Sequence, residues 1–264
     1  MNLSRVAPAA RRAGAALLDL LLPRACVACM RSLDQSDSGV VCGRCWSRLA
    51  LLPHPRCERC GHPRGAWDCR WCDGLPPYVR AARSVCWLGH GSAARIVHAL
   101  KYGGWPAAAD GMAARMARLA WPLDVMEERI ALVPVPLAPV RERERGFNQS
   151  ALLARRLGEH WHVPMQEGCL ARVRATRTQT RLTPAERRRL VSRAFRATPA
   201  AAALRGAHVV LVDDVVTTAA TLSQCAEALF SAGARIISIV TFARAPAIGD
   251  RASHRSDSGS WPLS

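Results

Sequence analysis

The residues best suited to chemistry lie near the C-terminus, where the apolar run 209–212 is followed at once by Asp213 and Asp214. Two adjacent carboxylates can accept hydrogen bonds from ribose hydroxyls or meet a Mg²⁺ ion. Small and hydroxyl-bearing residues come next, namely Thr217, Thr218, Ala219, Ala220 and Thr221. They let backbone N–H groups and hydroxyls approach a phosphate at the start of a helix, whose dipole favours an anion. The run predicts a strand–loop–helix site for a ribose 5-phosphate such as phosphoribosyl pyrophosphate (PRPP), together with Mg²⁺.

A simpler interpretation is that these Asp and Thr residues only cap the helix that follows. Capping needs one such side chain. The nine positions 213–221 contain two Asp and three Thr. A ligand site accounts better for that density of polar groups.

A second group of reactive side chains lies near the N-terminus. Eight of the eleven cysteines form four Cys-x-x-Cys pairs within 47 residues: Cys26 and Cys29, Cys42 and Cys45, Cys57 and Cys60, and Cys69 and Cys72. Two thiolates spaced in this way can share one metal ion, and two such pairs complete a tetrahedral Cys₄ zinc site. The four pairs therefore predict two structural zinc ions, with roles in folding, docking or nucleic-acid contact and none in catalysis.

The four Cys-x-x-Cys pairs can combine into two zinc sites in more than one way. We expect sequential pairing, in which the first two pairs form one site and the last two form the other, because each site then closes a short loop. A cross-braced pairing is the alternative. A disulfide framework is not expected in a cytoplasmic chain.

The charge of the chain points to anionic partners. Lys and Arg number 37 against 20 Asp and Glu, and Lys101 is the only lysine. The stretch 141–205 contains 15 Arg and five Glu. A polyanion or a phosphorylated small molecule is its natural partner.

The first 23 residues superficially resemble a signal peptide, with three Arg before a leucine-rich run. Asp19 interrupts this run, no small-residue cleavage site follows, and the run is too short to span a bilayer. We expect an amphipathic helix that packs on the rest of a cytoplasmic protein, without stable membrane insertion. Transient membrane contact is the alternative.

Hydrophobic patterning predicts the elements that position these sites. Strands are expected at 82–87, 130–134, 208–212 and 235–243, and helices at 92–102, after Pro106, at 148–160 and at 221–232. The stretch 165–205 is expected to hold short strands and a mobile loop. Strands that alternate with helices predict an α/β fold with a parallel sheet, whose ligands bind at the carboxyl ends of the strands.

The run 209–222 closely resembles the PRPP motif of type I phosphoribosyltransferases. Four further stretches are similar to the ComF family of competence-associated proteins: His98-Ala-Leu-Lys-Tyr-Gly103, Val133-Pro-Val-Pro136, Arg143-Glu-Arg-Gly-Phe-Asn-Gln149 and Thr176-x-x-Gln179-x-x-Leu182. The resemblance covers roughly residues 15–243. It implies an N-terminal helix (1–23), a double zinc ribbon (24–76), a phosphoribosyltransferase-like domain (77–245) and a disordered tail (246–264).

The resemblance also implies site residues. In type I enzymes the loop after the first core strand binds pyrophosphate, and it corresponds here to Pro134, Val135 and Pro136. Lys101 and Arg145 are the candidates to neutralise the pyrophosphate oxygens. A mobile hood corresponds to 174–195.

Two positions depart from the family pattern. Ala219 stands where relatives usually have Gly, and Leu190 stands where they have Asn. If the Gly is needed for a positive φ or for room beside the phosphate, Ala219 weakens or reshapes binding.

Two classes of function follow from the resemblance. In the first, the chain binds PRPP or a related sugar-phosphate and serves DNA uptake in natural transformation. Pentosyl transfer is left open, because no general base stands out in the sequence and no catalytic residue or acceptor can be assigned. In the second, the site is inactive and the chain is a single-stranded DNA-binding or adaptor protein of the competence machinery.

Overall fold

The computed structural model describes residues 24–34, 36–37, 39–64, 69–173, 194–217 and 219–246. The predicted N-terminal helix, the predicted hood up to residue 193, Thr218 and the tail from 247 onward lie outside these described residues.

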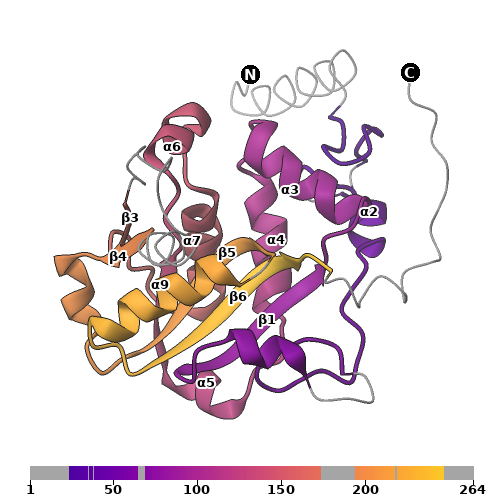
Figure 1. The fold of residues 1–264 in the computed structure, drawn as a ribbon. Coiled ribbons are helices and arrows are strands. Elements are labelled where there is room, and N and C mark those ends of the chain that lie inside the picture. The colour runs from indigo at the N-terminus through magenta and orange to yellow at the C-terminus, as the bar shows by residue number, and fades with distance from the viewer. Residues whose placement is uncertain are drawn as a thin grey trace, which may run out of the picture.

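A four-stranded parallel sheet forms the centre of the molecule (Figure 1). Its strands are β1 (Val79–Trp87), β6 (Ile236–Arg244), β5 (His208–Val216) and β2 (Arg129–Pro134), in this spatial order. Every neighbouring pair is parallel. Strands β5 and β6 are almost wholly buried, as expected for a parallel sheet covered on both faces. The predicted α/β class is confirmed.

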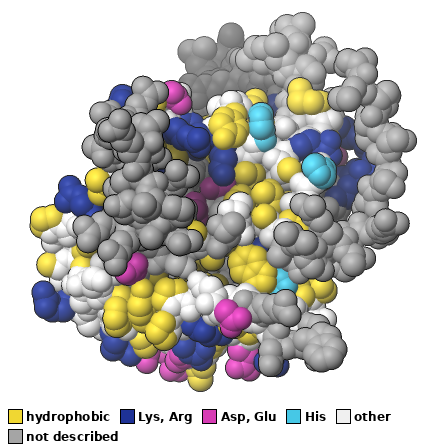
Figure 2. Space-filling view, in the orientation of Figure 1, with side chains coloured by type: hydrophobic (Ala, Val, Ile, Leu, Met, Phe, Trp, Pro, Cys, Tyr) yellow, Lys and Arg dark blue, Asp and Glu magenta, His cyan; other side chains and the backbone are white. Residues whose placement is uncertain are grey.

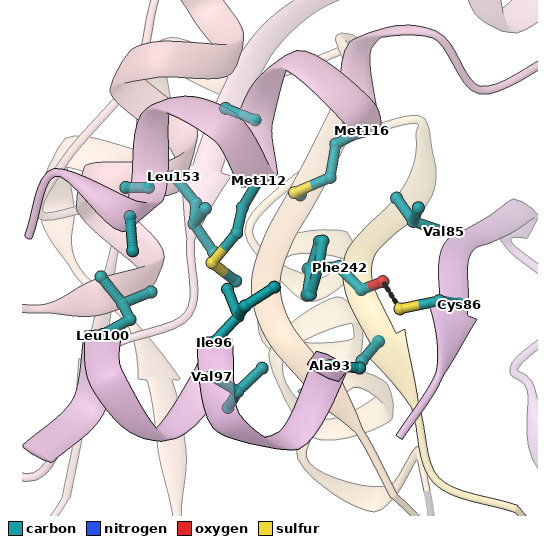
Figure 3. Close-up of a cluster of buried hydrophobic side chains, with 14 of the residues drawn as sticks. Val85, Cys86, Ala93, Ile96, Val97, Leu100, Met112, Met116, Leu153 and Phe242 are labelled. Atoms are coloured by element: carbon teal, nitrogen blue, oxygen red, sulfur yellow. Dashed lines mark hydrogen bonds between the residues drawn. The ribbon is translucent and has the colours of Figure 1, made fainter. Parts of the chain in front are cut away.

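Three helices cover one face of the sheet: α3 (Ser92–Tyr102), α4 (Ala108–Ala117) and α7 (Gln149–Trp161). They pack on Val210, Val212 and Phe242 of the central strands. Phe242 lies in the middle of this cluster, between side chains of α3 and α4 (Figure 3), and its carbonyl oxygen accepts a hydrogen bond from the Cys86 thiol at 3.6 Å.

The opposite face is covered by α9 (Ala220–Ser231), the 3-10 helix η3 (Pro199–Leu204) and a short antiparallel pair, β3 (Leu170–Arg172) and β4 (Phe195–Ala197). They pack on Val209 and Leu211 of β5. One strand thus supplies alternate side chains to two separate cores, which is the two-residue period of β-structure.

The remaining elements are α2 (Gly43–Ser47), the 3-10 helix η2 (Arg70–Gly74), α5 (Leu123–Glu128) and α6 (Pro139–Arg145). Neither α5 nor α6 was predicted. No residue of α6 is buried, so no apolar periodicity marks it.

Strand β5 is longer than the predicted segment 208–212 and includes both acidic residues. Asp213 pairs with Thr241 and Val215 with Ala243, because β6 extends far enough to continue the ladder. Helix α9 begins at Ala220, one residue earlier than predicted.

The cysteine-rich segment packs on the α/β domain at two places. Cys26, Cys42 and Cys45 belong to the core beneath α3 and α4, whereas Cys57 and Cys60 belong to the core beneath α9. The first ribbon, which contains the cysteines from Cys26 to Cys45, and the second ribbon, which contains those from Cys57 to Cys72, therefore join different cores. Across the described residues, no helix is long and apolar enough to cross a membrane.

Candidate ribose-phosphate site and zinc centres

The first cysteine cluster comprises Cys26, Cys29, Cys42 and Cys45, whose sulfur atoms all lie within 4.8 Å of one another. The Sγ–Sγ distances of Cys26–Cys45 and Cys29–Cys42 are both 3.8 Å. Zinc–sulfur bonds of about 2.3 Å in a tetrahedron give a sulfur–sulfur distance of about 3.8 Å. The backbone N–H of Cys42 also points to the Cys26 sulfur at 3.3 Å. This cluster fits a structural zinc ion.

The second cluster comprises Cys57, Cys60, Cys69 and Cys72. Its sulfur atoms lie 3.4 Å apart for Cys57–Cys72 and 3.2 Å apart for Cys60–Cys69. Arg59 lies between Cys57 and Cys60 in the sequence, and its guanidinium donates to the carbonyl oxygens of Leu75 and Pro76 at 2.9 and 2.7 Å. These bonds fix the chain where it leaves the ribbon. The predicted sequential pairing is confirmed in both clusters.

The two acidic residues of β5 differ in their environments. Asp214 is only 2% exposed, whereas Asp213 is partly exposed. One Asp214 oxygen accepts a hydrogen bond from Gln149 Nε2 at 3.3 Å, and the other lies 2.5 Å from Lys101 Nζ. Asp213 Oδ1 accepts from the Ser150 hydroxyl at 2.7 Å and from the Asp214 N–H at 2.9 Å. Asp214 is therefore turned into the protein, and Asp213 is the member of the pair nearer to solvent.

Burial and the neighbouring Asp214 charge raise the pKa of Asp213 to about 7. The hydrogen bond from Ser150 and the charge of Lys101 act in the opposite direction. Asp213 can therefore change its protonation state near neutral pH.

Beyond β5 the chain turns through 217–219 into α9. Ala219 has φ 57° and ψ −7°, the left-handed conformation, and is the N-cap residue of the helix. Thr217, Ala220 and Thr221 are exposed, whereas Ala219 is buried. The first turn of a helix leaves N–H groups without intrahelical partners and carries the positive end of the dipole. The loop offers an anion both backbone and hydroxyl donors.

Comparison with known proteins links both halves of the chain to described families. Residues 17–86 match the model of the double zinc ribbon domain, and residues 143–260 match that of the phosphoribosyl transferase domain. The chain is 32% identical over 231 residues to the DNA utilization protein YhgH of Salmonella typhi, covering 83% of this chain and 96% of the relative.

The chain belongs to the ComF family.

Two competence proteins are also similar to this ComF protein over shorter segments. Competence protein F of Haemophilus influenzae is 35% identical over 115 residues, 44% of this chain and 50% of the relative. Competence protein ComFC of Bacillus subtilis is 37% identical over 107 residues, 40% of this chain and 41% of the relative. Among solved structures, a glutamine PRPP amidotransferase from B. subtilis matches 50% of this chain and 25% of its own, with 21% identity and a TM-score of 0.37.

The ComF-like stretch that ends at Gln149 supports the acidic pair from the start of α7. The Asn148 carboxamide caps this helix by accepting from the Ser150 N–H at 3.0 Å, and it donates to the Val135 carbonyl at 3.1 Å. Arg145 donates to Gln149 Oε1 at 2.6 Å, and Gln149 in turn donates to Asp214. This cap places Gln149 and Ser150 in the first turn of α7, facing the end of β5.

The candidate pyrophosphate segment lies beside this cap, at the end of β2. Pro134 and Pro136 have no N–H, and the Val135 N–H donates to the Val212 carbonyl at 3.0 Å. The backbone of these three residues is therefore fixed within the protein and has no free N–H. An anion bound here would rely on the side chains of Lys101 and Arg145.

Another ComF-like stretch, His98–Gly103, reaches the same place from α3. Lys101 contacts Asp214, and the Tyr102 ring lies under the Arg145 guanidinium at 4.9 Å. Figure 2 shows acidic side chains recessed near the middle of the visible face, with basic side chains above them. Ser150 and Tyr102 were not predicted as site residues. Their positions directly after Gln149 and Lys101 in the two motifs were the available signal.

A second hollow lies between the ribbons and α4. This groove of about 520 Å³ is lined by Trp46, Leu49, Leu51, His54, Arg56, Cys57, Glu58, Arg83, Val85, Arg115, Arg118, Leu119 and Ala120. The Arg115 guanidinium stacks on the Trp46 ring at 3.6 Å. Burial lowers the pKa of Arg56, Arg83 and Arg115. This groove was not predicted from the sequence, because its residues come from three separate segments, 46–58, 83–85 and 115–120.

Proposed function

We propose that this ComF protein binds PRPP or a related ribose 5-phosphate at the end of β5 and the start of α9, in the cytoplasm, and that this binding serves the handling of incoming DNA. One observation carries the proposal. A half-buried carboxylate, Asp213, lies near the carboxyl end of β5, six residues before the left-handed Ala219 that leads into the N-terminus of α9. Asp213 would accept hydrogen bonds from the ribose hydroxyls, and Thr217, Thr221 and the backbone after Ala219 would bind the 5-phosphate.

The proposal covers binding and assigns no acceptor for a pentosyl transfer. A transfer would place positive charge on the ribose anomeric carbon while pyrophosphate leaves, and cations near the leaving group would stabilise it. Lys101 and Arg145 are the side chains so placed, beside the segment from Pro134 to Pro136. Mg²⁺ would arrive bound to the pyrophosphate oxygens of PRPP.

Calorimetry with PRPP and with ribose 5-phosphate tests this function. The wild-type protein is expected to bind both ligands. Asp213→Asn should weaken binding about 10- to 100-fold, the worth of a charge-assisted hydrogen bond. Glu159→Gln is the matched control, because Glu159 is exposed on α7 and pairs only with Arg156 among the described residues. Failure of the wild-type protein to bind either ligand would refute the proposal.

The groove between the ribbons favours a second candidate function, contact with single-stranded DNA. Within the described part of the chain, none of Arg56, Arg115 and Arg118 forms an ion pair with a carboxylate. Arg56 and Arg115 are partly buried and Arg118 is exposed. Cations without a paired carboxylate attract phosphates, and the Arg115–Trp46 stack offers a flat surface to a base. The names of the relatives, which refer to DNA utilization and competence, agree with such a partner.

The slope of log affinity against log salt for an oligothymidylate tests this second function. A protein that contacts several phosphates loses affinity steeply, with a slope of about −0.7 per contact for single strands. The double variant Arg115→Ala with Arg118→Ala should lose about one to two phosphate contacts, so its slope should become less negative by about 0.7 to 1.4. Arg155→Ala is the control, since Arg155 is an exposed residue of α7 outside the groove. An unchanged slope in the double variant would exclude the groove.

A further inference from the structure

Lys101 is the only lysine among 37 basic residues, and its ammonium lies on the buried acidic residue of the candidate site. The Nζ atom is 2.5 Å from Asp214 Oδ2, and the two side chains are 22% and 3% exposed. An ammonium is a compact point charge, whereas a guanidinium is a wide planar fork. In a chain that otherwise uses Arg throughout, a compact cation contacts the buried carboxylate.

The residues around the acidic pair do not fit a protein-held Mg²⁺ ion. Mg²⁺ takes six oxygen ligands in near-octahedral geometry, and a protein usually contributes one or two carboxylates to that shell beside substrate phosphates and water. Asp214 Oδ2 is fully buried and lies against the Lys101 ammonium, and Asp213 Oδ1 already accepts two hydrogen bonds. In the described part of the chain, the only groups of three or more side chains arranged for a metal are the two cysteine clusters.

We infer that Lys101 is the resident cation of the acidic pair, so that the protein binds its ribose-phosphate ligand without needing a divalent metal. This inference rests on the proposed function. The ammonium neutralises Asp214 inside the protein and has three N–H donors, of which Asp214 needs one. Because Lys101 is partly exposed, its remaining donors can reach the pyrophosphate oxygens of PRPP, where Mg²⁺ would otherwise supply the positive charge.

The fold fixes Lys101 in this role from both sides. Val97 and Leu100 of the same helix are buried in the core, and Tyr102 contacts Arg145. Gln149 holds the other Asp214 oxygen. Lys101 is a positioning and ligand-contacting residue, and removing its charge should affect pyrophosphate more than the 5-phosphate bound by the loop before α9.

The binding test uses PRPP and ribose 5-phosphate, in buffer with Mg²⁺ and in buffer freed of metal by a chelating resin. EDTA is avoided because it would also remove structural zinc. The wild-type protein should bind PRPP within about threefold of the same affinity in both buffers. Lys101→Met should weaken PRPP binding about 10- to 100-fold and leave ribose 5-phosphate within about threefold. PRPP binding by the wild-type protein only when Mg²⁺ is present would overturn the inference while sustaining the proposed function.

Thermal unfolding with the metal alone provides a test that does not depend on ligand binding. In the Lys101→Met variant the carboxylates lose their cation, so MgCl₂ should raise its Tm above that in NaCl of equal ionic strength. The wild-type protein and Lys101→Arg, which keep a positive charge, should show no such rise. An equal rise in the wild-type protein would contradict a resident ammonium. If Lys101→Met is too unstable to measure, the double variant Lys101→Met with Asp214→Asn removes both charges. Its Tm should be the same in MgCl₂ as in NaCl, and it should bind PRPP as weakly as is expected of Lys101→Met.

Discussion

At the scale of single residues, the two adjacent carboxylates Asp213 and Asp214 have different roles. Asp214 faces inward, where Lys101 and Gln149 satisfy its two oxygens, and leaving such a buried charge unpaired would cost several kcal/mol. Asp213 is closer to solvent and keeps one oxygen clear of the hydrogen bonds from Ser150 and the Asp214 N–H. Adjacent residues of one strand point to opposite sides, so one carboxylate can organise the site while its neighbour meets a ligand.

The raised pKa of Asp213 predicts a specific pH dependence of stability. Its folded pKa of about 7 lies above the ordinary value near 3.9, so the folded protein binds this proton more tightly than the unfolded chain. The wild-type protein should lose this stabilisation as pH rises from about 4 to about 7. Asp213→Asn cannot titrate, so its free energy of unfolding relative to wild type should rise over the same interval and then level off. Urea unfolding of both proteins at several pH values checks this, and two parallel pH profiles would contradict it.

Ala219 predicts a change that separates stability from binding. A left-handed conformation costs an L-residue about 1 kcal/mol or more, while Ala219→Gly loses a buried methyl group worth about 0.8 kcal/mol. We expect the stability of Ala219→Gly to change by less than about 1 kcal/mol. Its affinity for ribose 5-phosphate should rise, by up to about tenfold, because the loop gains room beside the phosphate.

Ala228→Gly is the control, because Ala228 lies inside α9 and away from the phosphate loop. It should lose about 1 kcal/mol of stability and gain no affinity. Equal affinities of the two Gly variants would argue against crowding of the phosphate by the Ala219 methyl group. Calorimetry and chemical unfolding provide both measurements.

At the scale of elements, the first ribbon docks on α4 through one close contact. The Trp46 and Phe242 rings pack edge to face with their centroids 6.2 Å apart, and the Arg115 guanidinium of α4 stacks over the Trp46 ring at 3.6 Å. A Cβ atom at Gly111 of α4 would lie 2.4 Å from the Trp46 ring. The helix accepts a glycine in its interior because the indole needs that space.

Gly111→Ala should therefore destabilise the protein by about 1 to 3 kcal/mol through overpacking, although Ala in a helix is usually favoured over Gly by about 1 kcal/mol. Chemical unfolding measures the change. In a Trp46→Leu background the clash disappears, so the same substitution should become neutral or stabilising. Equal effects in the two backgrounds would refute the contact.

At the scale of the whole molecule, each ribbon supports a different core, and the second one borders the loop that precedes α9. Ser223 in the first turns of α9 donates to the Gly74 carbonyl at 3.2 Å. The buried Arg244 donates to the Cys60 carbonyl at 2.6 Å and pairs in register with Val216, just before the phosphate loop. The second zinc site is thus joined to the candidate ligand site by backbone and side-chain contacts.

Loss of the second zinc should therefore impair ligand binding more than loss of the first. Cys60→Ser and Cys42→Ser should each leave about one zinc ion per chain instead of two. We expect ribose 5-phosphate affinity to fall clearly in Cys60→Ser and little in Cys42→Ser. Metal analysis and calorimetry on both variants check this, and equal losses of affinity would contradict the coupling.

Local patterns in the sequence determined much of this protein. The Cys-x-x-Cys spacing predicted both metal clusters and their pairing, because neighbouring thiolates share a metal only over short distances. The helix 92–102 and the central strands followed from periodicity, since a buried face repeats every two or 3.6 residues. The acidic pair, the threonines and the presence of Ala219 among them were also visible, because they follow from residue type.

Only the tertiary structure decided which partners these residues have. The sequence could not place Lys101 on Asp214, Ser150 on Asp213 or Arg244 on Cys60, because each pair joins segments far apart in the chain. Nor could it show that β5 continues through both Asp residues, since the ladder with β6 outweighs the poor strand propensity of Asp. The type of a side chain determines which charge or hydrogen bond it can supply, and long-range packing determines which partner it contacts.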